Sequence, residues 1–357
     1  MPLKNVLFTV ENTDPACYWL TSYVETLLVQ CWYPTTVCTN SWSMKRIIYK
    51  YLKETSDDTS NLLFKMHDFG FRGATSVESA GIGGLSHLVN FRGTDTMAAI
   101  CVGRQFYNCP MAGHSVPAAE HSSITSWERS GEVDAYANML KQFPNGAIAV
   151  VSDSFDVFKA CREMWGGTLK EQVIERGKRG GILVVRPDSG DPAPTVCKVL
   201  DILGERFGTS TNGKGYKMLP NYLRVIQGDG ISLESLNVIL EAMKAQNWSA
   251  ENLSFGSGGA LLQRLHRDTL KIAYKCSMIE ANGKVINVFK DPITDPGKKS
   301  KKGRLSVELQ DGQYVTMQEG SGNPEKDLLI TVFENGKLTK EWSLDEIRER
   351  VDSNGYD

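Results

Sequence analysis

Four short apolar runs, each ending in a loop of charged residues and glycines, constrain the fold of this chain more than any other feature. A helix-like stretch follows each loop. Short apolar runs that alternate with helical segments are typical of βα units in a parallel sheet. Chemistry repeated at the carboxyl ends of such strands is the layout of a barrel enzyme's active face. The four loops are Ser152–Asp156, Arg186–Gly190, Gln227–Gly230 and Gly256–Gly259.

Length, charge and cysteine usage agree with this interpretation. A chain of 357 residues can hold a barrel-sized domain and a smaller appendage. The net charge of −2 gives no indication of a nucleic-acid or membrane partner. No signal peptide pattern and no membrane-spanning apolar run is visible. The eight cysteines form no C-x-x-C pair, which favours reduced thiols in a cytoplasmic protein and disfavours a zinc site.

The chain is expected to fold in two parts. Helices are predicted over Pro15–Gln30 and Ser43–Glu54, and the Gly- and Ser-rich residues 67–96 are typical of loops. We therefore expect an irregular α/β barrel core over residues 1–270. The dipeptides Asn282-Gly283 and Asn335-Gly336 predict hairpins. Residues 271–357 are thus expected to form a small antiparallel appendage, closed by a helix over Leu344–Val351.

Each candidate site has a structural alternative. The Gly256–Gly259 loop is either a tight turn or a phosphate-binding nest. Arg186 and Asp188 form either a surface ion pair or part of a binding site. The basic run Lys298–Arg304 is either a solvated loop or a contact for a polyanionic substrate. His121 follows a stretch of small residues, and it is either structural or a reactive imidazole.

Ten motifs resemble, in number, order and spacing, those of the nicotinamide phosphoribosyltransferases. The resemblance covers nearly the whole chain. It implies transfer of a phosphoribosyl group from phosphoribosyl pyrophosphate to nicotinamide, with magnesium, by a homodimer with shared active sites and a type II phosphoribosyltransferase barrel. The motifs are Val6–Asp14, His67–Gly70, Ala80–Gly83, Gly93–Thr96, Ser115–His121, Val151–Ser154, Arg186–Gly190, Val225–Gly230, Phe255–Gly259 and Asn287–Pro292.

The resemblance also implies roles for individual residues in the pocket. Phe69 would stack on the nicotinamide ring, and Asp95 would accept a hydrogen bond from its carboxamide. Ser152 would lie on the same pocket wall. His121 resembles the histidine that family members phosphorylate with ATP, and Asp156 resembles the carboxylate that orients it. No metal ligands are assigned.

A second set of residues would hold the phosphates and ribose of the substrate. Transfer through a ribosyl cation-like centre with a departing pyrophosphate requires arginines, backbone amides and a metal more than a strong acid. The members of this set are Arg72, Arg186, Asp188, Gly228, Asp229, Gly258, Gly259, Arg267 and Lys298.

The chain departs from the family's pattern at its start, and this leaves two classes of function open. Family members begin with a further domain before the segment matching Asn5, which this chain is expected to lack. That domain supplies an aromatic residue opposite the one matching Phe69, in the neighbouring subunit's site. The chain is therefore either an enzyme or a non-catalytic binding protein. A nicotinate phosphoribosyltransferase is a rival, but Asp95 would repel the nicotinate carboxylate.

Overall fold

The computed structural model describes residues 1–353 and residue 355, and the chain divides into two compact units. We call them the hairpin unit, Met1–Tyr33 with His266–Trp342, and the barrel unit, Pro34–Leu265 with the residues from Ser343 onward. The sequence suggested one boundary near residue 270. The structure instead groups the first 33 residues with the hairpins and the last helix with the barrel.

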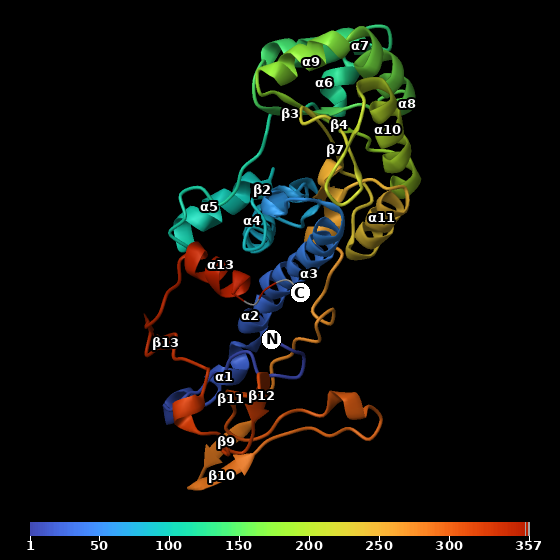
Figure 1. Cartoon of the computed structure of the whole chain (residues 1–357). Helices are drawn as coiled ribbons and strands as arrows, with labels where there is room; N and C mark the ends of the chain where they lie inside the picture. The colour runs from blue at the N-terminus through green and yellow to red at the C-terminus, as the bar shows by residue number, and fades with distance from the viewer. Residues whose placement is uncertain (354, 356–357) are drawn as a thin grey trace. The chain divides into compact units, whose positions relative to one another are not determined.

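A sheet of six parallel strands forms the centre of the barrel unit (Figure 1). Neighbouring strands follow the order β2-β1-β8-β7-β4-β3, and each recorded pair is parallel. The apolar side chains of Val185, Val225 and Phe255 are buried, as expected for strands covered on both faces. The strands are β1 (Met66–Asp68), β2 (Gly93–Thr94), β3 (Ala147–Val151), β4 (Ile182–Arg186), β7 (Leu223–Gln227) and β8 (Leu253–Ser257).

An irregular segment, residues 114–118, closes the sheet into a barrel. His114 forms a parallel bridge with Gly93 of β2, and Ala118 forms one with Ala149 of β3. The backbone N–H of Thr94 donates to the His114 carbonyl at 3.0 Å, and that of Ala149 donates to the Pro117 carbonyl at 3.0 Å. The segment therefore joins the two edge strands of the sheet. Around the ring, the strands follow one another in chain order, and the barrel predicted from the sequence is confirmed.

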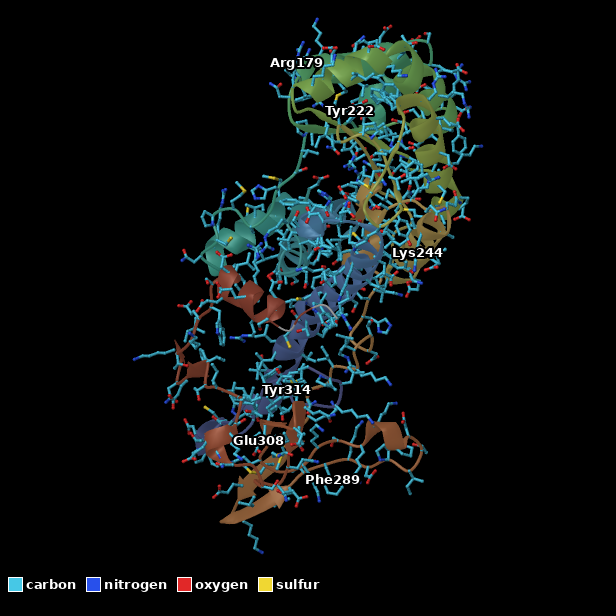
Figure 2. All side chains as sticks on the ribbon, viewed as in Figure 1. Arg179, Tyr222, Lys244, Phe289, Glu308 and Tyr314 are labelled. Atoms are coloured by element: carbon cyan, nitrogen blue, oxygen red, sulfur yellow. The ribbon has the colours of Figure 1, made fainter. Side chains whose placement is uncertain are left out.

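Helices follow the strands and cover the outside of the barrel, with α7, α9 and α10 beside β3, β4 and β7 in Figure 1. Side-chain caps start several of them, such as the reciprocal Ser232–Ser235 capping box of α11. Lys244 of α11 (Figure 2) pairs with Glu54 of α3 at 2.9 Å. The helices are α3 (Trp32–Thr55), α4 (Val77–His87), α5 (Met97–Phe106), α6 (His121–Thr125), α7 (Glu132–Gln142), α8 (Val157–Lys159), a π-helix (Ala160–Thr168), α9 (Lys170–Lys178), α10 (Pro192–Phe207), α11 (Leu233–Ala245), α12 (Gly259–Leu262) and α13 (Leu344–Asp352).

The Gly-rich stretch that the sequence predicted to be a loop contains α4, and that prediction was wrong. The glycines serve close helix packing. A Cβ at Gly81 would lie 2.8 Å from a methyl group of Val102 in α5, and one at Gly84 would lie 2.9 Å from the Cβ of Ala99. The two helices therefore approach more closely than larger residues would allow, and this packing outweighs the low helix propensity of glycine.

The first helices also differ from the predicted bounds. The expected helix Pro15–Gln30 is broken into short turns, of which α1 covers Leu20–Tyr23 and α2 covers Glu25–Leu28. The helix predicted from Ser43 begins instead at Trp32. Its early residues include Pro34 and the β-branched Thr35 and Thr36, which give a weak helical pattern, but Val37 on this part is fully buried. Tertiary packing, rather than local propensity, extends the helix.

The hairpin unit contains three antiparallel hairpins, and both predicted hairpins are confirmed. They are β9–β10 (Met278–Ala281, Lys284–Asn287), β11–β12 (Ser306–Gln310, Gln313–Met317) and β13–β14 (Phe333–Glu334, Lys337–Leu338). Asn282 and Asn335 have positive φ angles of 51° and 48°, as their tight turns require. The side chains of Glu308 and Tyr314 (Figure 2) mark the second hairpin.

Hydrogen bonds attach the first residues of the chain to these hairpins. The Val6 N–H donates to the Thr316 hydroxyl at 3.0 Å, and Arg304 pairs with Glu11 at 2.7 Å. The last helix, α13, packs its buried Leu344 against α4 and α5 of the barrel unit. Across the part of the chain that the structure describes, none of the helices is both long and apolar enough to cross a membrane.

Candidate active site

The carboxyl ends of the barrel strands carry most of the residues predicted for the site. Each strand ends in a loop, and parallel strands bring these loops to one end of the barrel. Phe69 and Arg72 follow β1, Asp95 follows β2, and His121 follows the closing segment. The other strands lead into Ser152 and Asp156 (β3), Arg186 and Asp188 (β4), Gly228 and Asp229 (β7), and Gly258 and Gly259 (β8).

A cavity of about 360 Å³ lies among these loops. Its lining combines an aromatic pair, two guanidinium groups and two carboxylates, which come from three strand ends and the stretch after the closing segment. This mixture suits a ligand with both a flat ring and anionic groups. The lining residues are Phe69, Phe71, Arg72, Asp95, Glu120 and Arg186.

Phe69 and Arg186 lie beside each other in the lining of the cavity. The Arg186 guanidinium carbon lies 5.2 Å from the centroid of the Phe69 ring. The ring packs directly over Gly256, where any Cβ would collide with it, so the glycine gives the aromatic its place. A Cβ at Gly228 would lie 2.9 Å from the Nε of Arg186. The two glycines therefore leave the space that the ring and the guanidinium occupy.

Asp188 fixes the direction of Arg186. The Nε and Nη2 of Arg186 donate to the two carboxylate oxygens of Asp188 at 3.0 and 2.9 Å. Each side chain is 14% exposed, so the pair is largely shielded from water. Such a two-point ion pair orients the guanidinium plane and leaves its remaining N–H donors for a ligand. A plain surface ion pair, the alternative left open by the sequence, does not describe this geometry.

Asp95 is held by a neighbour that the site prediction omitted. The hydroxyl of Ser115, on the closing segment, donates to Oδ1 of Asp95. The Asp95 N–H donates to the Asp68 carbonyl at 3.0 Å. The carboxylate is exposed in the cavity wall, and Oδ2 is free of recorded hydrogen bonds among the described residues. Only the tertiary structure could bring Ser115 to Asp95, because 20 residues separate them.

Asp68 is a buried carboxyl that connects two of the pocket loops. Its Oδ1 accepts a hydrogen bond from the Gly70 N–H at 2.7 Å, while its carbonyl accepts the one from Asp95. Burial raises the pKa of the Asp68 carboxyl to about 6. The residue lies within the His67–Gly70 motif, which was the signal that could have identified it.

Arg72 and Glu120 form an ion pair at the rim of the cavity, with an N–O distance of 2.8 Å. Partial burial acts to raise the pKa of Glu120, but the hydrogen bond and charge of Arg72 hold it below its usual value. Glu120 also caps α6, since its side chain accepts from the Ser123 N–H. Arg72 is 77% exposed, so it can exchange this carboxylate for an anionic ligand at small cost.

His121 is paired with a different carboxylate from the one expected. Its Nε2 lies 3.0 Å from Oδ1 of Asp153. Asp156 instead caps α8, where its Oδ1 accepts from the N–H groups of Phe158 and Lys159 at 3.0 Å each. The expected contact between His121 and Asp156 is absent from the described hydrogen bonds, because the helix amides take that carboxylate.

Ser152 does not line the cavity. It is fully buried, its hydroxyl donates to the Val150 carbonyl at 2.9 Å, and it accepts from the Trp165 indole N–H at 3.0 Å. The hydrogen bond that it donates and the one that it accepts are therefore both made to buried parts of the barrel unit. The structure therefore gives Ser152 a role in fixing the end of β3. It does not lie among the residues that line the cavity, where the sequence placed it.

The loop after β8 presents open backbone. Gly258 precedes α12 with a φ of −106° and a ψ of −105°, and a Cβ at Gly259 would meet nothing within 4 Å. A Cβ at Gly70 would lie 3.0 Å from the Gly258 carbonyl, so the loops after β1 and β8 touch. At the end of β7, Gln227 is buried and donates to the Asp229 carbonyl at 2.9 Å, which shapes the turn carrying the exposed Asp229.

Two predicted phosphate contacts belong to the hairpin unit. Arg267 donates to the Ile272 carbonyl at 3.0 Å and pairs with Asp268 at 3.2 Å. Lys298 pairs with Asp295 at 3.1 Å. Both side chains are exposed, and their roles in binding phosphate remain predictions.

Comparisons with known proteins agree with the resemblance seen in the sequence. Residues 64–337 match the model of the nicotinate phosphoribosyltransferase (NAPRTase) family. The chain is 51% identical to a nicotinamide phosphoribosyltransferase of Xanthomonas campestris over 99% of its own length and 76% of the relative. It is 34% identical to one of Acinetobacter baylyi, over 97% and 72%. A solved nicotinate phosphoribosyltransferase of Porphyromonas gingivalis matches at 14% identity with a TM-score of 0.43; the match covers 82% of this chain and 61% of that one.

Proposed function

The chain belongs to the nicotinate phosphoribosyltransferase family, and we propose that it transfers the phosphoribosyl group of 5-phosphoribosyl 1-pyrophosphate to nicotinamide. The products are nicotinamide mononucleotide and pyrophosphate, as in NAD salvage. The observation that carries the proposal is the cavity, where an aromatic ring, two arginines and a carboxylate converge from separate strand ends. The names of the two curated relatives support nicotinamide as the acceptor.

The bonds that change define what the site must supply. The ring nitrogen of nicotinamide attacks C1 of the ribose, the bond from C1 to the pyrophosphate oxygen breaks, and pyrophosphate leaves with the electron pair. Phe69 stacks on the nicotinamide ring and Asp95 accepts from its carboxamide, oriented by the Ser115 hydroxyl. Arg186 and Arg72 balance the growing negative charge of the leaving group. Asp188 keeps Arg186 in place for this contact.

Magnesium and ATP belong to the same proposal. Among residues 1–353 and 355, no group of three or more His, Cys, Asp or Glu side chains is arranged as metal ligands. Mg²⁺ in such enzymes is commonly held by one or two carboxylates together with substrate phosphates, and the exposed Asp229 fits that arrangement. When bound, the ion supplies neutralising charge for pyrophosphate. ATP would phosphorylate His121, whose side chain is 42% exposed.

The proposal includes a homodimer in the cytoplasm. All eight cysteines are unpaired, which suits a reducing compartment. Apolar side chains near the start of the chain are strongly exposed, such as Tyr18 at 79% and Tyr23 at 74%, and exposed apolar groups of this kind favour association between subunits.

A turnover assay tests the proposed reaction. The purified chain is incubated with phosphoribosyl pyrophosphate, Mg²⁺ and either nicotinamide or nicotinate, with and without ATP, and the mononucleotide is quantified. We expect nicotinamide mononucleotide as the main product. Product from nicotinate alone would assign the rival activity. Binding of nicotinamide by calorimetry without any product would favour a non-catalytic binding protein.

A further inference from the structure

A single guanidinium joins the last helix of the chain to two segments that lead into the cavity. Arg348 lies on α13, beside α5 in Figure 1, and its side chain is only 8% exposed. Its Nε and Nη2 donate to the Leu88 carbonyl at 3.0 and 2.8 Å. The same Nη2 donates to the Ala112 carbonyl at 2.6 Å. Leu88 and Ala112 are fully buried, so the three groups meet inside the barrel unit.

The two segments run side by side and are hydrogen-bonded to each other. The His114 N–H donates to the Arg92 carbonyl at 2.7 Å, and the Thr94 N–H donates to the His114 carbonyl at 3.0 Å. We call residues 92–95 together with residues 112–115 the wall ladder. Here the closing segment joins β2, so the register of this pairing decides which side chains of the two segments lie next to each other.

The wall ladder is clamped at one end and forms a contact of the cavity at the other. Arg348 holds the clamped end through Ala112. At the far end, the Ser115 hydroxyl donates to Oδ1 of Asp95. A hydrogen bond to a carboxylate requires close approach and good alignment. Because only two residues separate Ala112 from Ser115, a shift of the clamped end displaces the hydroxyl.

Gly113 shows how closely the wall ladder is packed. A Cβ at this position would lie 2.8 Å from a methyl group of Leu88 and 2.8 Å from one of Thr94. Contacts this short force the neighbouring groups to move. Gly113 is not among the glycines with a positive φ, so space rather than backbone conformation requires a glycine here. The segment therefore has one close-packed position, and Arg348 holds it there.

We propose that Arg348 is a positioning residue for nicotinamide recognition: through the wall ladder, it keeps the Ser115 hydroxyl on the Asp95 carboxylate. The inference rests on the proposed function, in which Asp95 accepts from the carboxamide. Arg348 itself is not among the residues that line the cavity. Its planar guanidinium reaches two carbonyls at once, which a lysine cannot do with the same geometry. A buried carbonyl that loses its donor is costly, so without Arg348 the segment moves toward other donors or water.

Steady-state kinetics of Arg348→Met tests this role, because methionine fills the space without donating. The KM for nicotinamide should rise about tenfold, as expected when a hydrogen bond to a charged group is lost. The KM for phosphoribosyl pyrophosphate should change by less than about twofold, since Arg186 and Arg72 follow other strands. Arg348→Lys should give an intermediate value. The matched control is Asp345→Asn, which removes the exposed partner of Nη1, leaves both carbonyl contacts and should behave like the wild type.

Further variants separate positioning from general stability. In the Ser115→Ala background, Arg348→Met should raise the KM for nicotinamide by less than about twofold, because the contact that it protects is already lost. Gly113→Ala disturbs the wall ladder from within and should raise this KM as Arg348→Met does. Leu200→Ala removes a buried side chain of α10, lowers stability and should leave the KM unchanged. An equal rise in Leu200→Ala, or full additivity with Ser115→Ala, would overturn the proposal.

Amide hydrogen exchange measures the wall ladder without any substrate. The N–H groups of Thr94 and His114 join the two segments, and their exchange should be about tenfold faster or more in Arg348→Met. If the wild-type chain neither binds nor converts nicotinamide but these amides respond, the proposed function fails and the clamp stands. If the chain is active and Arg348→Met leaves the KM for nicotinamide unchanged, the positioning role is wrong, whatever the exchange shows.

Circular dichroism of each variant confirms that the fold is retained. If Arg348→Met does not fold, Arg348→Lys and Gly113→Ala carry the same test, because both disturb the wall ladder while keeping the rest of the barrel unit. A wild-type KM for nicotinamide in both of these variants would contradict the proposal.

Discussion

The barrel unit and the hairpin unit are built from similar apolar residues but bury them to very different extents. Val185 and Phe255 in the barrel are at most 1% exposed, whereas Val285, Ile286 and Phe333 in the hairpins are 64%, 50% and 60% exposed. Strands of the barrel have neighbours on both edges and are covered by helices. Each hairpin sheet has only two strands, which bury little surface and are marginal alone. A rigid scaffold is therefore available in the barrel, and the strand-end residues depend on it.

One charged pair from each unit shows the same contrast. Arg186 and Asp188 in the barrel are each 14% exposed, so their attraction is little screened by water. Lys302 and Glu319 in the hairpin unit are 38% and 45% exposed. Exposed pairs of this kind contribute about 0–1 kcal/mol at most. The following experiments, in order of decreasing expected effect, test whether the two units differ as much in energy as they do in burial.

The largest difference is expected between two phenylalanine truncations. Phe255→Ala removes a ring that is 1% exposed and should lower the free energy of unfolding by about 3–5 kcal/mol. Phe333→Ala removes a ring that is 60% exposed and should change it by within about 0.5 kcal/mol. Chemical denaturation of both variants measures the difference. Equal losses would show that the hairpin unit is as well packed as the barrel.

Substitution of Arg186 should have the next largest effect, on catalysis. Arg186→Ala removes the guanidinium over Phe69 and leaves Asp188 unpaired, and kcat/KM for phosphoribosyl pyrophosphate should fall by about 10²–10³. Arg186→Lys keeps the charge but not the two-point geometry, so it should recover little. Lys284→Ala in the exposed strand β10 is the control. Steady-state kinetics of the three variants tests the assignment, and a loss below about threefold for Arg186→Ala would contradict it.

The buried carboxyl of Asp68 should make stability depend on pH. Its pKa is about 6 in the folded chain, above the unfolded value, so its contribution is fully present below about pH 4 and is lost as the pH rises through 6. Asp68→Asn keeps the oxygen that accepts from Gly70 but does not titrate. Relative to the wild type, it should gain on the order of 2–3 kcal/mol between pH 4 and 8.

Denaturation curves of Asp68→Asn and the wild type at several pH values check this result. The two stabilities should converge at low pH, apart from a constant offset caused by the substitution. If the two proteins instead show parallel pH profiles, the Asp68 carboxyl ionises in the folded chain at its ordinary pKa. Burial then does not raise that pKa.

The smallest effect concerns the choice between substrates. Asp95→Ser removes the carboxylate that accepts from the nicotinamide amide and repels the nicotinate carboxylate. The ratio of kcat/KM for nicotinamide over nicotinate should fall by about tenfold or more. The kinetics of both substrates measure this ratio. An unchanged ratio would place amide recognition elsewhere in the cavity.

Much of the barrel and of the site could be predicted from sequence because the signals are local. The apolar runs before Ser152 and Arg186 identify strands by their own composition, and the residues at their ends identify the face where a site forms. The hairpins at Asn282 and Asn335 depend on dihedral angles that few residues adopt, so the Asn-Gly dipeptide is sufficient to predict them. Spacing of the motifs was sufficient to indicate the family.

Other features could not be predicted because they depend on partners distant in the chain. The closing segment has no strand-like pattern, and it forms strand pairs only because β2 and β3 present open edges on either side of it. The glycines of α4 are typical of a loop in the sequence, and only the packing of α5 against them explains why they lie in a helix. Ser152 follows a strand like a site residue, yet Trp165 and the Val150 carbonyl engage its hydroxyl.

The sequence by itself determined the class of fold, the family and the set of strand ends where chemistry occurs, since these follow from residue types at short spacing. Tertiary structure alone decided which carboxylate pairs with the histidine and which one caps a helix. Asp153 and Asp156 are only three residues apart, but helix α8 takes Asp156 for its free N–H groups and leaves Asp153 for His121. Backbone N–H donors at a helix start must be satisfied. That requirement cannot be read from the order of residues, and it decides which aspartate pairs with His121.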